Sequence, residues 1–433
     1  MKNFVLFRKP IFSVDLDVFA YELIFRTSPK DFSFFSKEEF KEDVEDFPTL
    51  EDLESSGYTE KDKGTIIGIN NIFSLIGLKK AINNKRGLIK FTKNLLKSDF
   101  IYTLPKNYIG ILIEQYLSKD VDDEYRIAVN RLHNSGYIIV LDNFNFSGLA
   151  SPLLAAANMV KIDFLRNSED EIKNILTTVF DYGIEAIADN LNSREDFEKA
   201  KSLSFSLFSG NFFSRPLIIA AKDIEGNKLN YLQILKEIHS PELDYKKLED
   251  IIKRDLALSY KLLKYINSAF FGLTREIDSI KTALVLLGDK EIKRWVTVTI
   301  FATLASDKPS EVLRLSLLRA KFAELLAEKL GFSDMKEKFF LMGLFSLIDV
   351  ILDKPKEEIL GDIPLDDEIK NALIKNSKNE YGVVLNIILL YEEQKIDVLE
   401  EILNGTNISL DDVSQYYISS LEWADEAFKA TQE

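Results

Sequence analysis

Apolar and polar residues alternate over the opening stretch of the chain, from Arg8 to Arg26. The stretch is rich in β-branched and aromatic residues and predicts two short strands around a Ser-Val-Asp turn. The period of two divides the second strand into two faces, with Phe19, Tyr21, Leu23 and Phe25 on one and Val18, Ala20, Glu22, Ile24 and Arg26 on the other. A carboxylate on such an apolar face is costly unless it is paired or bound to a cation. Taken alone, the pattern favours a structural Glu22–Arg26 pair.

Strand and helix patterns then alternate beyond an acidic segment at about residues 30–62. Strand patterns occur at 88–92, 109–114, 137–142, 159–163, 184–189 and 205–208, and helix patterns at 64–84, 122–134 and 168–181. Strands joined by helical crossovers imply a parallel sheet, and about seven or eight of them in roughly 220 residues fit a closed barrel. The acidic segment is interpreted as a solvated insertion, with a lid or a partner surface as the alternative.

A charged residue stands near the C-terminal end of each of six predicted strands: Glu22, Lys90, Glu114, Asp142, Lys161 and Asp189. In a parallel barrel these strand ends meet at one mouth, where functional sites are built. One charged strand end means little, but the repetition on successive strands predicts a polar, charged pocket.

Helical periods replace the strand patterns from about residue 228 onward. They cover 244–265, 280–287, 311–330, 335–352, 366–393 and 396–403. The chain is therefore expected to be α/β and then all-α, with a barrel domain over residues 1–220 and a helical domain over residues 221–433.

Composition narrows the possible chemistry. With 433 residues, 46% of them hydrophobic, the chain can bury large cores in two or three domains. The absence of cysteine excludes disulfides, thiolate metal sites and cysteine nucleophiles, and two histidines leave little room for histidine metal sites.

A net charge of −15 argues against binding long nucleic acid, although a small anion could still occupy a local basic pocket. With no bilayer-spanning apolar run and no leader pattern, we expect a cytoplasmic protein without membrane insertion.

Four stretches of the N-terminal half carry a family resemblance: Glu22-Leu23-Ile24 followed by Arg26, Asp142-Asn143-Phe144-Asn145, Lys161-Ile162-Asp163, and Ser209-Gly210-Asn211-Phe212-Phe213-Ser214-Arg215-Pro216. Together they resemble the EAL domain, a TIM-like barrel that hydrolyses the bacterial second messenger cyclic di-GMP with divalent metal ions. The resemblance covers about residues 4 to 220.

The resemblance implies metal-ligand positions at Glu22, Glu114 and Asp142. It also implies a phosphate contact at Arg26 and a water-orienting role at Lys161. The candidate nucleotide-binding residues are Glu22, Arg26, Lys90, Glu114, Asp142 and Lys161.

Several positions depart from the family pattern. Lys90 stands at the position of a ligand asparagine, and Asn143 replaces the second aspartate of an Asp-Asp pair. Asp189 stands at the position of the glutamate that serves as the base, and Leu117 and Ser209 replace a loop-stabilising glutamate and a closing glutamine. Each of these departures bears on metal binding or on catalysis.

A hard divalent ion requires several oxygen ligands, mostly carboxylates. Lys90 and Asn143 together shift the pocket by two units of charge away from metal binding, and the ammonium of Lys90 could neutralise the remaining carboxylates instead. We therefore expect no metal or other cofactor and no active catalytic residue at the family positions Lys161 and Asp189. Cyclic di-GMP binding stays open because phosphates could still meet Arg26, Lys90 and Lys161.

A second resemblance lies in residues 266–273 and 277–288, with the pattern Asn-Ser, Gly, Ile, Ala and Leu-Gly. It resembles the HDOD domain, a relative of HD-type metal phosphohydrolases, over about 200 residues. Those hydrolases need a His-Asp pair, whereas the comparable turn here carries Ser346 and Asp349, and His239 is far off in sequence. Without histidine ligands, the domain is expected to be a helical regulatory or interaction module.

The two resemblances together match a bacterial EAL–HDOD signalling architecture. We expect a signalling or adaptor protein that binds signalling proteins through its HDOD domain and carries a catalytically silent barrel. The alternatives are an active cyclic di-GMP phosphodiesterase using magnesium or manganese, a metal-free cyclic di-GMP sensor, and a barrel enzyme of different chemistry that uses Lys161 as a Schiff-base or general-base residue.

Overall fold

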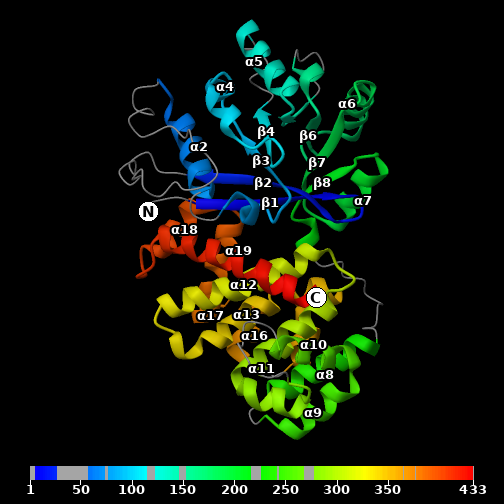
Figure 1. Cartoon of the computed structure of the whole chain (residues 1–433), viewed down its shortest axis with the longest axis vertical. Helices are drawn as coiled ribbons and strands as arrows, with labels where there is room; N and C mark the ends of the chain where they lie inside the picture. Colours follow the sequence, from blue (N-terminus) through cyan, green and yellow to red (C-terminus); the bar gives the residue numbers. More distant parts are fainter. Residues whose placement is uncertain are drawn as a thin grey trace. The chain divides into compact units, whose positions relative to one another are not determined.

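The computed structural model describes residues 5–26, 57–73, 77–114, 122–145, 153–215, 226–240, 243–267, 277–363, 365–375 and 377–432 (Figure 1). The chain divides into two compact units. Unit 1 comprises Met1–Arg215 and Leu389–Glu422, and unit 2 comprises Pro216–Ile388 and Trp423–Glu433. The predicted boundary after residue 220 lies close to the first of these divisions, but the prediction did not include the return of residues 389–422 to unit 1.

Eight strands of unit 1 form a closed barrel. They are β1 (Val5–Ser13), β2 (Val18–Arg26), β3 (Arg86–Lys90), β4 (Ile109–Glu114), β5 (Ile138–Asp142), β6 (Met159–Asp163), β7 (Glu185–Leu191) and β8 (Leu207–Gly210). Neighbouring strands from β2 to β8 are parallel, whereas β1 pairs antiparallel with both β2 and β8. The predicted barrel is therefore confirmed, as is the predicted turn between the two opening strands.

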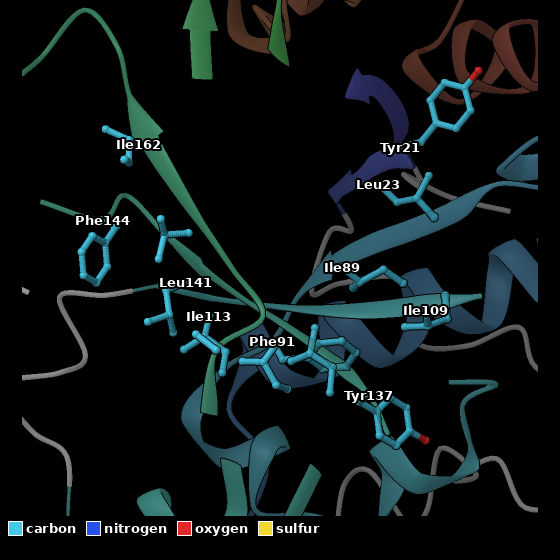
Figure 2. Close-up of a cluster of buried hydrophobic side chains, with 14 of the residues drawn as sticks. Tyr21, Leu23, Ile89, Phe91, Ile109, Ile113, Tyr137, Leu141, Phe144 and Ile162 are labelled. Carbon is cyan, nitrogen blue, oxygen red and sulfur yellow. The ribbon is translucent and has the colours of Figure 1, made fainter. Parts of the chain in front are cut away.

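The two faces of each strand belong to different cores, because successive side chains point to opposite sides. One face lines the barrel interior, where a small apolar cluster consists of Ile11, Ala20, Leu88, Leu112, Val140, Met159, Ile187 and Leu207. The other face packs under the surrounding helices in a much larger cluster, and Figure 2 shows part of it, including Tyr21, Leu23, Ile89, Ile113 and Ile162. The sequence alternation thus separates an interior lining from an outer core.

One detail of the predicted alternation is wrong at the start of β2. Phe19 packs against the interior cluster and Val18 belongs to the outer one, the reverse of the predicted faces. The reason is an irregularity in the hairpin: Ile11 pairs with Ala20, but Phe12 pairs with Val18. Phe19 therefore has no partner in the register. The side chains that precede Ala20 in sequence point to the faces opposite to those predicted, whereas the predicted faces hold from Ala20 onward.

The helices wholly within unit 1 are α2 (Glu60–Asn71), α3 (Leu78–Ala81), α4 (Lys93–Leu96), α5 (Asp123–Asn134), α6 (Glu169–Asp181), α7 (Arg194–Ser202) and α18 (Ile396–Leu403). The predicted helices at 122–134 and 168–181 are confirmed as α5 and α6, whose first turns are capped by Asp122 and Ser168. A single helix over 64–84 is wrong, because α2 ends at Asn71 and α3 begins only after Gly77, which has a positive φ of 79°. Of the acidic segment, residues 30–56 lie outside the described residues.

Residues 389–422 complete unit 1 by packing against its first strand and its outer core. The Tyr391 hydroxyl donates a hydrogen bond of 3.1 Å to the backbone carbonyl of Leu6, and the Tyr391 ring lies 5.0 Å from the ring of Phe7. Tyr391 also packs on Tyr417, and Ile418 contacts the outer core of the barrel. The antiparallel strand that closes the barrel is thus covered by a segment from the far end of the chain.

The described part of unit 2 is entirely helical, as predicted. Its helices are α8 (Gly226–Ile238), α9 (Tyr245–Arg254), α10 (Leu256–Ile266), α11 (Ile280–Leu304), α12 (Ser310–Lys329), α13 (Lys336–Phe345), α14 (Ile348–Leu352), α15 (Lys356–Asp362) and α16 (Asp367–Lys375). The division between the units falls within two further helices, α17 (Glu380–Glu392) and α19 (Leu410–Gln432).

Three predicted helices of this half are interrupted. The helix over 244–265 breaks at Asp255, whose carboxylate accepts a hydrogen bond from the Leu258 amide and so begins α10. The helices over 335–352 and 366–393 divide likewise into α13 and α14, and into α16 and α17. In α11 the non-helical Gly288, with φ 71° and ψ 169°, produces a kink. Among the residues described, no helix combines the length and apolar character needed to cross a membrane.

We predict that Tyr391→Phe weakens the attachment of β1 without unfolding the protein. The substitution keeps the ring but removes the donor to the Leu6 carbonyl, which costs about 1 kcal/mol for a typical buried hydrogen bond. Hydrogen exchange of the β1 amides, followed by mass spectrometry of the full chain, should become several-fold faster.

The matched control is Tyr182→Phe, because the Tyr182 side chain is 60% exposed at the surface of the same unit. This control should leave β1 exchange unchanged. Equal β1 exchange in wild type and Tyr391→Phe would contradict the inferred role of residues 389–422.

Candidate functional site

Each of the eight strands adds one polar residue to the interior face, two positions from its residue in the interior apolar cluster. These residues, called the polar ring below, are Lys9, Glu22, Lys90, Glu114, Asp142, Lys161, Asp189 and Ser209. In β1 the polar residue precedes its apolar neighbour, because this strand runs opposite to the others. All six charged residues predicted from the strand ends belong to the ring.

Lys161 lies at the centre of the ring and is only 4% exposed. Its Nζ is 2.7 Å from Glu22 Oε2 and 3.1 Å from Asp189 Oδ2. A third carboxylate oxygen, Asp142 Oδ1, is 3.6 Å away. Burial alone would lower the pKa of Lys161, but the charges of these carboxylates outweigh burial and raise it above its ordinary value. Lys161 is therefore an ammonium ion.

Lys90 joins two further carboxylates at a more accessible place, since its side chain is 35% exposed. Its Nζ is 2.7 Å from Glu114 Oε1 and 2.8 Å from Asp142 Oδ2. Burial would lower its pKa too, but Asp142 and Glu114 raise it on balance. Asp142 thus contacts two ammonium groups, those of Lys90 and Lys161.

Lys9 completes the charged part of the ring, and the sequence analysis did not identify it. Its Nζ donates a hydrogen bond of 2.7 Å to Asp189 Oδ1. Burial would raise the pKa of Asp189, but the charges of Lys161 and Lys9 outweigh burial and lower it to about 2. The signal that could have found Lys9 is the antiparallel hairpin, which places the start of β1 beside Glu22.

Ser209 is the one neutral member of the ring. It is fully buried, and its hydroxyl has no hydrogen-bond partner within the described part of the chain. Gly210 follows it with φ 144°, and a Cβ there would lie 2.2 Å from the Leu191 carbonyl oxygen. Only glycine therefore allows β8 to approach β7 so closely beside the ring.

A polar cap on α2 holds this helix beside the ring. Asp62 is fully buried and accepts hydrogen bonds from Thr59, Thr92 and Asn94, the last two lying just after β3. Burial would raise the pKa of Asp62, but these hydrogen bonds lower it on balance. The neighbouring Lys61 lies with its Nζ 3.9 Å from Glu114 Oε2 at the edge of the ring.

The donor set of the ring does not fit the divalent metal ions that the family resemblance implies. Each of its four carboxylates lies within 4 Å of at least one lysine ammonium, and an ammonium cannot act as a metal ligand. Within the described residues, no three or more of the residue types His, Cys, Asp and Glu are arranged to hold a metal ion. A dication would have to displace lysines that are already paired.

The sequence analysis also named Asn143, Arg26 and Leu117 as positions of interest. Asn143 follows β5 in a left-handed conformation, with φ 51°, and its side chain is exposed. Arg26 ends β2, but its side chain, like the whole of Leu117, lies outside the described residues. The Glu22–Arg26 pair thus remains a prediction, and the cationic partner that the structure gives Glu22 is Lys161.

In unit 2 the turn that resembles an HD motif carries a different set of groups. Ser346 Oγ accepts a hydrogen bond of 3.2 Å from Arg319 Nη1, and Asp349 Oδ2 lies 3.6 Å from Lys356 Nζ. Burial raises the pKa of Asp349, although Lys356 opposes this effect. Two cations and one carboxylate do not form a metal-binding set.

His239 is engaged elsewhere in unit 2, directly after the end of α8. Its Nε2 lies 2.9 Å from Thr297 Oγ1. Burial, assisted by the positive charge of Lys293, lowers the pKa of His239 to about 4, so the ring is neutral at ordinary pH. This histidine contributes a hydrogen bond between two helices.

Asn267 of the HDOD-like pattern has a structural role. Its side-chain amide donates to the carbonyls of Leu263 and Ile277, and its oxygen accepts from the Ile277 amide. Asn267 therefore ties the end of α10 to the segment that leads into α11.

A closed barrel with a charged interior ring, followed in sequence by an all-helical unit, defines a class of two-module proteins. The HDOD domain family matches residues 229–352, which lie in unit 2. The chain belongs to the EAL–HDOD family. It is 31% identical to the uncharacterized protein YuxH of Bacillus subtilis (strain 168) over 434 residues, which covers 98% of each chain.

A second relative is CdgJ of Vibrio cholerae serotype O1, named a cyclic di-GMP phosphodiesterase. It is 29% identical over 419 residues, which covers 96% of this chain and 91% of CdgJ. Among solved structures, the calcium and cyclic di-GMP complex of Klebsiella pneumoniae BlrP1 shows 17% identity and a TM-score of 0.37, over 50% of this chain and 56% of BlrP1. A likeness at this level carries no argument about this chain.

We predict that Asp189 makes the stability of the protein depend on acid pH. Because its pKa is lower in the folded state than its ordinary value of 3.8, the ionised carboxylate stabilises the fold above about pH 4. This contribution, of order 2 kcal/mol, is lost as the pH falls through about 2. Thermal unfolding of Asp189→Asn, followed by far-UV circular dichroism between about pH 5 and pH 2, should show lower stability at pH 5 and a weaker pH dependence than wild type.

The control for this experiment is Asp15→Asn, at an exposed position in the hairpin turn. This variant should follow the wild-type pH profile. A wild-type profile in Asp189→Asn would show that the carboxylate of Asp189 is not held by Lys9 and Lys161.

Proposed function

We propose that this chain is a signalling or adaptor protein whose EAL-type barrel does not hydrolyse cyclic di-GMP. The observation that carries the proposal is the ammonium of Lys90, which lies 2.7 Å from Glu114 and 2.8 Å from Asp142. It occupies the place between two carboxylates that a catalytic metal ion would need.

The electrostatic argument concerns what Lys90 does to a dication. At about 4 Å, a dication and an ammonium repel each other by several kcal/mol even in a well-screened protein environment. Glu114 and Asp142 would attract the ion, but both are already neutralised by lysines. The lysines of the ring already act as counter-ions to its carboxylates. Binding of a metal ion there would therefore gain little electrostatic free energy.

The same contacts limit how the ring could hold a nucleotide. Lys161 is enclosed by three carboxylates, so it is a poor partner for a phosphate. Lys90 and Lys61 are more exposed and remain the better candidates for a phosphate contact. In this proposal any cyclic di-GMP binding is metal-free and serves sensing.

The proposed role of unit 2 is regulation through protein partners. Its HD-like turn holds Ser346 and Asp349 beside Arg319 and Lys356, a set without an imidazole. Since the described residues of this turn offer no metal-binding set, the proposed role of the helical unit is interaction with other proteins.

Two alternative functions of the barrel each rest on one feature, the name of a relative and the buried Lys161. An active metal-dependent phosphodiesterase is favoured by the name of the relative CdgJ. A barrel enzyme with a Schiff-base lysine would use Lys161, but a nucleophilic amine must be uncharged, and the surrounding carboxylates keep Lys161 protonated. The hydrolysis experiment below separates the first alternative from the proposal.

We predict that the purified full-length protein releases no linear dinucleotide from cyclic di-GMP with magnesium or manganese. The physical reason is the absence of a site that could hold the metal ions. Chromatography of the reaction mixture measures product directly, and CdgJ assayed under the same conditions serves as the reference. Metal-dependent turnover by this chain would refute the silent-barrel proposal.

We further predict that Lys90→Asn combined with Asn143→Asp creates metal binding. The double variant removes the ammonium, restores an oxygen ligand and adds a carboxylate, so magnesium or manganese should raise its melting temperature by linkage between binding and folding. At a concentration about 100-fold above the dissociation constant, the stabilisation is about 2.7 kcal/mol. Wild type should show no such response.

The matched control exchanges an exposed lysine of the same unit, Lys85→Asn, together with Asn143→Asp. If the metal response of this control equals that of the Lys90 double variant, the role assigned to Lys90 is wrong. Hydrolysis is not expected in either variant, because Asp189, Leu117 and Ser209 remain altered.

A further inference from the structure

Unit 2 contains a pocket of about 1080 Å³ that the proposed function does not use. It is lined by residues of α10, α11, α12 and α19, all of them within unit 2. Its volume lies slightly above the range of about 300–1,000 Å³ that is typical of small-molecule sites. The pocket is therefore large enough for a metabolite.

Aromatic side chains form part of its lining. Tyr265 of α10 and Trp295 of α11 stack, with ring centroids 5.9 Å apart and an interplanar angle of 25°. Trp423 of α19 lines the same pocket. Flat aromatic surfaces of this kind favour a planar ring as the ligand, because stacking needs a π-face on both partners.

The remaining lining contains charged residues of both signs. Four basic residues and three acidic residues line the pocket, in a chain whose net charge is −15. The basic residues are Lys261, Lys264, Arg294 and Lys321. Two of them, Arg294 and Lys321, both pair with Glu324, so they are not the residues to receive an anionic ligand.

Lys261 is the basic residue best placed to receive an anionic group. It is half-buried, and its Nζ donates a hydrogen bond of 2.8 Å to the carbonyl of Thr431. Within the described part of the chain, Lys261 has no carboxylate partner at ion-pair distance. An ammonium has three donors, so among the described residues Lys261 keeps donors that are available to a ligand.

Arg294 stiffens the aromatic lining. Both of its terminal nitrogens donate to Glu324, at 3.0 Å each, and its guanidinium carbon lies 5.1 Å from the ring centroid of Trp423. Burial would lower its pKa, but Glu324 and nearby acids raise it on balance, so the charge is retained. The bidentate pair fixes the guanidinium against Trp423, and the pocket is organised without a ligand.

We propose that this pocket binds a nucleotide, with its base against Tyr265 and Trp295 and its phosphate at Lys261. A planar ring and a phosphate together match the two features of the lining, whereas either group alone matches only one. The proposal does not depend on whether the barrel binds or hydrolyses cyclic di-GMP.

The chain supplies its own probe for this site. It contains only two tryptophans, Trp295 and Trp423, and both line the pocket. Intrinsic tryptophan fluorescence of the full-length protein therefore reports on this pocket and not on the barrel. Titration with GMP should change the emission in a saturable way, whereas guanosine and inorganic phosphate should each bind at least about tenfold more weakly.

Variants of Lys261 test the phosphate contact. Lys261→Met should weaken GMP binding by about tenfold or more, because it removes a charged hydrogen-bond donor. Lys261→Arg keeps the charge and should bind within a few-fold of wild type. Lys236→Met, at an exposed position of α8, is the matched control and should bind like wild type.

Three results would overturn the proposal. They are the lack of a saturable fluorescence change with GMP, equal affinities of wild type and Lys261→Met, and calorimetric binding of GMP without a fluorescence response. The last result would place the nucleotide outside this pocket. Because hydrolysis by the barrel is measured by product formation, failure here is distinguishable from failure of the proposed function.

Discussion

The barrel depends on mutual neutralisation of charges that are held together at one end of its interior. Four carboxylates and three lysines converge there, and Lys161 alone contacts three of the carboxylates. Ions with so little solvent are tolerated only when each has a partner of opposite charge. This requirement also constrains the register of the strands, because a shift by one residue would turn a charged side chain outward and leave its partners unpaired.

The need for charge balance in the ring affects metal binding as well as the stability of the barrel. A catalytic metal site needs carboxylates whose charge is not yet compensated, so that a dication can supply the missing positive charge. In this barrel lysine side chains supply it permanently, and Lys90 does so at the accessible edge of the ring. The carboxylates of the barrel are thus balanced by lysine side chains of the same chain.

Much of this arrangement could be predicted from local patterns. The period of two and the alternation with helices were sufficient for the barrel and for six members of the ring. Lys9 was missed because β1 runs in the opposite direction, so its residue in the ring precedes the apolar position instead of following it. The packing of Phe19 was missed because a hairpin irregularity leaves no mark in the alternation. The return of residues 389–422 to unit 1 depends on tertiary packing, for which no local signal exists.

The hydrogen bond between Tyr391 and Leu6 has a consequence for folding during synthesis on the ribosome. The two residues are 385 positions apart, and Tyr391 emerges from the ribosome long after all eight strands have been made. During that interval β1 lacks the segment that covers it in the finished molecule. Until then, the apolar surface of unit 1 that residues 389–422 later cover stays exposed, and exposed apolar surface of this kind is what chaperones bind.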